Sequence, residues 1–67
     1  MVEFVDEYGA RIFIVVQIIK CFRENRGPYS QSHKTAKSVI EDSYGELYYL
    51  RDTVDEIAVK LFGKKEN

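Results

Sequence analysis

The sequence predicts an α+β fold, with a three-stranded antiparallel sheet and one helix in the order strand, strand, helix, strand. Three observations favour this class. The apolar run from Ile12 to Ile19 is rich in β-branched residues, which pack well on a pleated surface. Gly27 and Pro28 offer a turn after it. Further on, Ser43-x-x-Glu46 has the spacing of a helix capping box.

Each element is predicted from its local pattern. Residues 11–22 form the predicted first strand, which is apolar on both sides as a covered strand should be. Residues 23–28 connect it to a more polar second strand at residues 29–37. The helix begins near Asp42 or Ser43 and runs to about Arg51. Residues 56–61 suit a third strand, because their apolar side chains alternate with others.

An all-α fold is the alternative, because the same apolar positions also fit a heptad spacing. A break at residues 26–28 would then fold two helices into a hairpin, and two hairpins would form a dimeric bundle. The two seams are Val5, Tyr8, Ile12, Val15, Ile19 and Phe22, and then Ala36, Ile40, Ser43, Leu47, Leu50, Val54, Ile57 and Leu61.

Chain length favours a single domain, residues 1–67, that associates with a second copy. A domain of 67 residues has a thin core, and small domains usually add a disulfide, a metal or a partner. Cys21 is the only cysteine, which excludes a disulfide within the chain. His33 is the only histidine, and one cysteine with one histidine does not supply the four ligands typical of a structural zinc site. We therefore expect a homodimer without metal or cofactor.

Location and charge exclude some partners. The chain starts without a basic, apolar leader, and its longest apolar run is far shorter than a membrane span, so we expect a cytoplasmic protein with no membrane partner. The net charge is −1, with basic residues gathered in residues 20–37. Few aromatics accompany them, and no nucleic-acid-binding motif occurs. We expect no nucleic-acid partner, with weak binding through residues 20–37 as an alternative.

Catalysis is not expected, because no group of side chains has the arrangement of an active site. His33 stands among hydroxyl residues, but sequence proximity does not make a triad. We interpret it as an exposed histidine on a polar strand, with a proton-sensitive contact as the alternative. Cys21 follows an apolar run, which indicates a small buried side chain.

Aromatic and acidic residues gather in the last third of the chain. Tyr44, Leu47 and Tyr48 lie on the predicted helix, where Tyr44 and Tyr48 share a face. Tyrosine is enriched at interface hot spots. These side chains suit either a dimer core or a partner-binding surface. The acidic residues around them are Asp42, Glu46, Asp52, Asp55 and Glu56.

Two short motifs resemble a known family. Phe4-Val5-Asp6-x-Tyr8 near the start, and Thr53-x-Asp55-Glu56-Ile57 near the end, are similar to motifs of the small uracil-DNA glycosylase inhibitors of phi29-like Bacillus phages. The resemblance covers about ten residues, in the same order and in a chain of similar length.

The resemblance implies a dimeric protein, made in the cytoplasm of a host bacterium, that imitates duplex DNA in the glycosylase's DNA groove. Carboxylates take the place of phosphates, with Asp42, Glu46, Asp52, Asp55 and Glu56 in that role here. A pocket between the subunits captures the enzyme's minor-groove wedge side chain. By this analogy the pocket residues are Tyr44, Leu47 and Tyr48. The alternative function is a small helical regulatory or interaction module without DNA mimicry.

Overall fold

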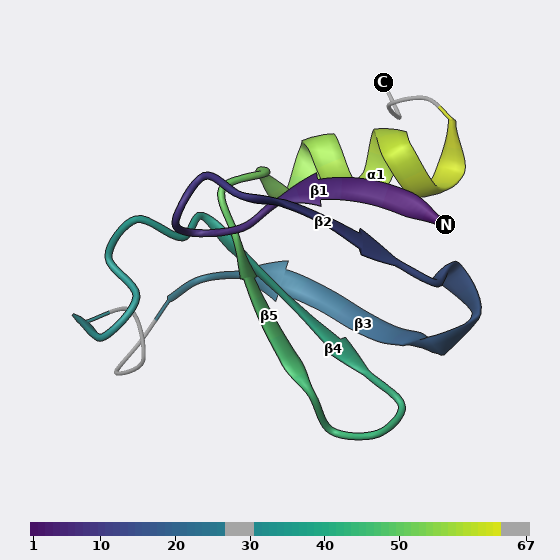
Figure 1. Cartoon of the computed structure of the whole chain (residues 1–67), viewed down its shortest axis with the longest axis horizontal. Coiled ribbons are helices and arrows are strands. Elements are labelled where there is room, and N and C mark those ends of the chain that lie inside the picture. Colours follow the sequence, from purple (N-terminus) through teal and green to yellow (C-terminus); the bar gives the residue numbers. More distant parts are fainter. Residues whose placement is uncertain (27–30, 64–67) are drawn as a thin grey trace.

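Five β-strands and one α-helix make up the part of the chain described by the computed structural model, residues 1–26 and 31–63. A short 3-10 turn, Val16–Ile18, separates the second strand from the third (Figure 1). The elements in chain order are β1 (Val2–Val5), β2 (Arg11–Ile14), β3 (Ile19–Glu24), β4 (Ser38–Asp42), β5 (Leu47–Leu50) and α1 (Val54–Phe62).

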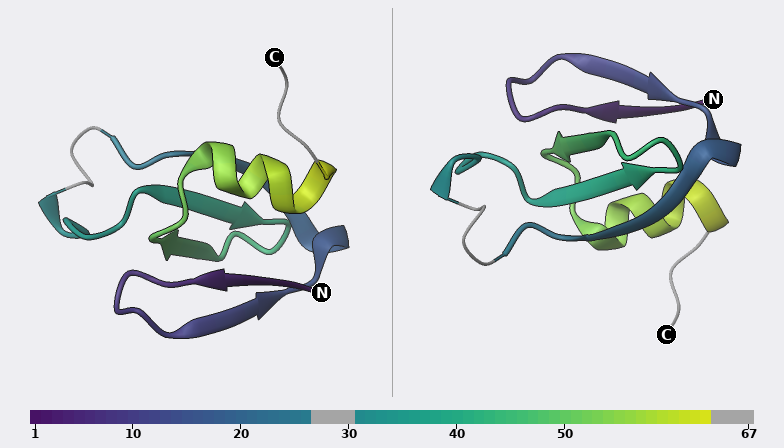
Figure 2. Two further views of the ribbon diagram at one scale, coloured as in Figure 1. Left: turned by 90° about the horizontal axis from the view of Figure 1, so that it is seen from above. Right: turned by 90° about the horizontal axis from the view of Figure 1, so that it is seen from below.

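The strands form two antiparallel sheets that meet along one short seam. β1 pairs with β2, and β3, β4 and β5 form a three-stranded sheet in that order. The end of β1 reaches the end of β5, where Asp6 bridges to Leu50. Figure 2 shows the first hairpin lying beside β5, with α1 across the three-stranded sheet. The prediction of an α+β fold with a three-stranded antiparallel sheet and one helix is confirmed; the predicted order of elements is wrong.

Five elements supply one residue each to the buried core. These residues are Phe4, Ile14, Ile40, Leu50 and Ile57. Burial of each such side chain contributes about 1.5–3 kcal/mol. The core therefore forms only when both sheets and the helix are in place.

Two hairpin turns share one design. In each, an aspartate side chain accepts hydrogen bonds from the amides two and four residues on, at 2.8–2.9 Å. The third residue after that aspartate is a glycine with a left-handed backbone: Gly9 (φ 87°) and Gly45 (φ 86°). This is a type I turn followed by a glycine bulge, a common three-residue hairpin loop. The motifs are Asp6-Glu7-Tyr8-Gly9 and Asp42-Ser43-Tyr44-Gly45.

The predicted helix from Asp42 or Ser43 to Arg51 is wrong, because this segment is the second of these turns followed by β5. Ser43 and Glu46 do not form a capping box. The Glu46 amide instead donates to the Asp42 side chain. The left-handed conformation of Gly45 then turns the chain back, so Tyr44 and Tyr48 do not share a helix face.

The predicted third strand at residues 56–61 is also wrong, because these residues lie in α1. The capping box is formed by Thr53 and Glu56, each of whose side chains accepts from the other residue's amide. Gly63 ends the helix with φ 90°, as left-handed C-caps commonly do. Ile57 and Leu61, four residues apart, both pack in the core region.

The long first strand is divided in two. Residues 11–22 bend at Val16–Ile18, so β2 pairs with β1 and β3 pairs with β4. The predicted connection at residues 23–28 begins too early, because Arg23 and Glu24 belong to β3. Of the predicted second strand, residues 31–37 form turns, and residues 29 and 30 lie outside the described residues.

The all-α alternative is wrong, since α1 is the sole α-helix in the described ranges. The burial predicted for Cys21 is wrong as well: its side chain is exposed on β3, beside Glu41. None of the helices in residues 1–26 and 31–63 combines the length and apolar character that crossing a membrane requires.

Replacing Gly45 with alanine should destabilise the fold by about 1 kcal/mol, because a side chain disfavours the left-handed backbone. A Cβ at this position would contact nothing, so the backbone alone sets the cost. Gly45→Asn should cost less, since asparagine tolerates this conformation. Urea denaturation measures both. Equal stability of the alanine variant and the wild type would contradict the observed turn.

Candidate functional site

Two tyrosines project from the matched turns into solvent. Tyr8 is 81% exposed and Tyr44 is 82% exposed. The turns are held by the aspartate and the glycine, so neither turn needs a tyrosine at this position. Large exposed aromatics that the local fold does not require are candidates for binding a partner.

A shallow hollow lies between the first hairpin and β5. Its volume is about 220 Å³. We call it the tyrosine hollow; its lining is Asp6, Glu7, Tyr8, Ile12, Leu47, Tyr48 and Tyr49. Two of the three predicted pocket residues, Leu47 and Tyr48, are therefore brought together. Tyr44 is not among the lining residues.

Three members of this lining, Tyr8, Ile12 and Tyr49, are not among the predicted pocket residues. The repeat of Asp-x-Tyr-Gly was the available signal, because it predicts two similar hairpins and hence an N-terminal strand pair beside the C-terminal one. The seam between β1 and β5 is a tertiary contact, which local patterns do not reveal.

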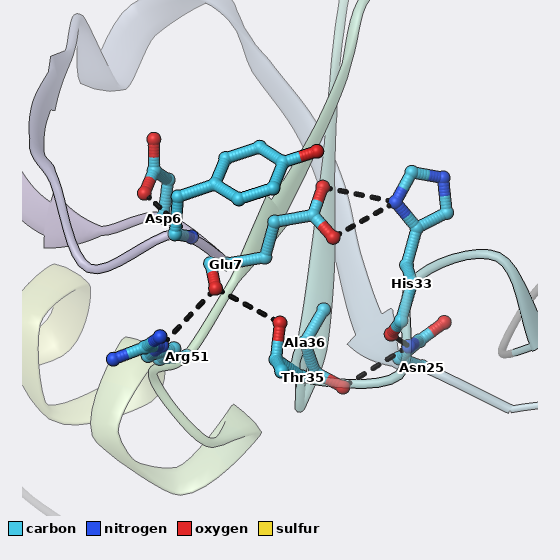
Figure 3. Close-up of polar contacts among 8 residues, drawn as sticks. Asp6, Glu7, Asn25, His33, Thr35, Ala36 and Arg51 are labelled. Atoms are coloured by element: carbon cyan, nitrogen blue, oxygen red, sulfur yellow. Dashed lines mark hydrogen bonds and ion pairs between the residues drawn. The ribbon is translucent and has the colours of Figure 1, made fainter.

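Glu7, which lines the tyrosine hollow, is held in place by polar contacts with His33, Thr35 and Arg51; we call this group the clasp (Figure 3). Nδ1 of His33 lies 3.0 and 2.9 Å from the two carboxylate oxygens of Glu7, whose side chain is only 11% exposed. The His33 ring stacks on the Tyr49 ring, with centroids 3.5 Å apart. The Glu7 carbonyl accepts from Thr35 Oγ1 and Arg51 Nε. His33 is thus half-buried in contact with a carboxylate rather than exposed on a strand.

Asp42 is buried and holds its turn rather than facing a partner. Its Oδ1 accepts from the Tyr44 and Glu46 amides, and its Oδ2 accepts from the Tyr48 hydroxyl at 2.8 Å. Burial opposes ionisation of this carboxyl, but the hydrogen bonds outweigh it and lower its pKa. The same hydrogen bond from the Tyr48 hydroxyl raises the tyrosine's pKa, with burial adding to the effect.

Two more of the predicted phosphate-mimicking carboxylates also serve the fold. Asp52 is buried, accepts from the Val5 amide, and pairs with Lys60 Nζ at 2.6 Å. Glu56 caps α1 through the Thr53 amide. Glu56 is exposed even so, as are the remaining two, Glu46 and Asp55. The five residues therefore do not form one free acidic face.

Asp42→Asn should destabilise the fold most at neutral pH and progressively less in acid. The folded-state pKa of Asp42 is lowered, so its stabilising effect is present above the unfolded value of 3.8 and is lost as the pH falls through the folded value. Urea denaturation of both proteins between neutral and strongly acidic pH measures the difference. A constant difference across this range would contradict the role of the ionised carboxylate.

His33→Ala should lower stability by about 1–2 kcal/mol, because it leaves a largely buried carboxylate without its partner. His33→Phe is the matched variant: it keeps a ring on Tyr49 but cannot bind Glu7. Its stability should fall between those of the wild type and the alanine variant. If both variants denature at the wild-type urea concentration, the clasp does not hold the first hairpin.

Comparison with family models, with curated proteins and with solved structures finds no match to this chain. Function is therefore inferred from the chain's own residues and from its two short motifs.

Proposed function

We propose that this chain is a non-catalytic protein-binding module whose tyrosine hollow receives an apolar side chain of its partner. The observation that carries this proposal is the lining of the hollow, where Tyr8, Tyr48 and Tyr49 meet Ile12 and Leu47. Tyrosine gives a large contact area at little cost in side-chain entropy. A cavity of about 150 Å³ can accept benzene, so a hollow of about 220 Å³ has room for one aliphatic side chain.

The partner that we propose is the uracil-DNA glycosylase of a host bacterium. The two motifs shared with phage inhibitors support this choice, and so does an aromatic hollow suited to the wedge side chain of such an enzyme. The hollow is formed within one chain, so capture of the wedge does not depend on a second copy. Association into a homodimer, which the thin core favours, is part of the proposal but is not needed by the hollow.

An interaction module without DNA mimicry is the second candidate. The observation that favours it is the internal use of Asp42, Asp52 and Glu56, which leaves Glu46 and Asp55 as the two of the five carboxylates that are exposed and have no role in the fold described above. A DNA mimic with few free carboxylates must gain most of its affinity from apolar contacts. Added salt screens charges but not apolar burial, so salt sensitivity separates the two contributions.

Uracil excision by a purified Bacillus glycosylase, titrated with this protein, tests the proposal. We expect full inhibition near stoichiometric amounts. Tyr8→Ala should raise the concentration for half-inhibition by about tenfold or more, as removal of a hot-spot side chain does. Tyr44→Ala is the matched control, because Tyr44 occupies the same turn position with the same exposure but lies outside the lining.

The outcomes separate the parts of the proposal. Both variants should keep the wild-type melting temperature, since both side chains are exposed. Equal loss of inhibition in the two variants would remove the tyrosine hollow from the mechanism. Absence of inhibition at large excess would exclude the glycosylase and leave the interaction module as the remaining function.

A further inference from the structure

β3 is the edge strand of the three-stranded sheet. It pairs with β4 on one side, and its other edge pairs with no strand in the described part of the chain. An unpaired edge presents main-chain donors and acceptors that can pair with another extended segment. This edge lies across β4 from the tyrosine hollow, so a ligand bound here would be independent of the proposed function.

An apolar groove runs beside this edge on the helix side. Its volume is about 380 Å³, and its lining is Val16, Ile19, Lys20, Cys21, Phe22, Leu61 and Phe62. The rings of Phe22 and Phe62 lie 6.3 Å apart between centroids. Phe62 is the last residue of α1, and its side chain is 71% exposed. The groove can therefore take apolar side chains from a segment that lies along β3.

The opposite side of the same edge is cationic. Arg23 Nη1 lies 3.6 Å from a Glu41 carboxylate oxygen on this side. Lys20 stands at the bulge of β3, so it borders the groove and also reaches the same carboxylate, with its Nζ 3.8 Å from the other oxygen. Both cationic side chains are more than half exposed. Two positive charges thus share one negative charge, which leaves one positive charge for a partner to neutralise.

We propose that the free edge of β3 binds an extended protein segment that alternates apolar and acidic residues. Successive side chains of a strand point to opposite faces. A segment added to β3 would place every second side chain in the groove beside Phe22 and Phe62, and the others toward Arg23, with Lys20 at the border between the two sides. Main-chain pairing supplies affinity and the alternating side chains supply specificity, as in other strand-addition complexes.

Charge favours this occupant over a second copy of the chain. Two β3 strands paired edge to edge would bring two sets of Lys20 and Arg23 together along one seam. This arrangement doubles the excess positive charge, whereas an acidic segment removes it.

Fluorescence anisotropy with a labelled peptide of alternating leucine and glutamate tests the proposal. We expect binding that weakens with salt, and no binding of the same peptide with lysine in place of glutamate. Arg23→Glu should weaken binding by about tenfold, because it reverses a charge at the contact. Arg11→Glu is the control, since Arg11 is also exposed but lies on β2, in the other sheet.

A peptide with methylated amides at alternate residues tests the main-chain pairing. It should bind at least about tenfold more weakly, because it lacks the donors that the edge requires. Unchanged affinity of this peptide, or of the Arg23→Glu variant, would overturn the proposal. So would failure of the leucine-glutamate peptide to bind. Sedimentation equilibrium tests the other occupant. If the protein is a dimer, if Phe62→Ser dissociates it and if the peptide does not, the edge binds a second copy of the chain.

Discussion

The short seam between β1 and β5 is the constraint on which the rest of the structure depends. Residues 5–7, at the end of β1, are joined to residues 49–52, at the end of β5, by two backbone hydrogen bonds and by one hydrogen bond to the Asp52 carboxylate. Val5 accepts from the Arg51 amide and donates to Asp52, and the Glu7 amide donates to the Tyr49 carbonyl. Without this seam the first hairpin would have no backbone pairing with the other sheet, and a two-stranded hairpin by itself is marginally stable in water.

Because the core is small, polar side chains add to the contacts at the seam. Asp52 also binds Lys60 of α1, and its carbonyl accepts from Ser38 of β4. One residue therefore ties a strand of each sheet to the helix. Loss of Lys60 would leave the buried Asp52 carboxylate without its charged partner, so the pair favours the arrangement in which β1, β4 and α1 meet.

The class of the fold could be predicted from the sequence because β-branched and aromatic residues dominate its apolar runs. The positions of the elements could not, because one local signal has two interpretations. An aspartate or serine that accepts from a nearby amide begins both helices and hairpin turns. At Asp42–Gly45 the glycine favours the turn, and at Thr53 the glutamate at the third helical position favours the helix.

The candidate site could be predicted only in part, because some of its residues are brought together by tertiary contacts. Tyr48 could be identified because aromatic residues are enriched in interfaces, and Leu47 because it is next to Tyr48 in the sequence. Tyr8 could not, since it joins the tyrosine hollow only through the seam.

Many carboxylates accept hydrogen bonds from within the chain, which limits how they can bind a partner. For the same reason, the sequence alone overstates the number of acidic side chains that are free. Asp6 and Asp42 close the two turns, Glu7 and Asp52 hold the seam, and Glu56 caps the helix. A carboxylate that accepts fixed hydrogen bonds keeps its charge but offers fewer free lone pairs to a partner. The net charge of −1 is therefore a poor guide to the surface. In the proposed function, specificity depends instead on the aromatic lining of the hollow, which Asp6 and Glu7 also line.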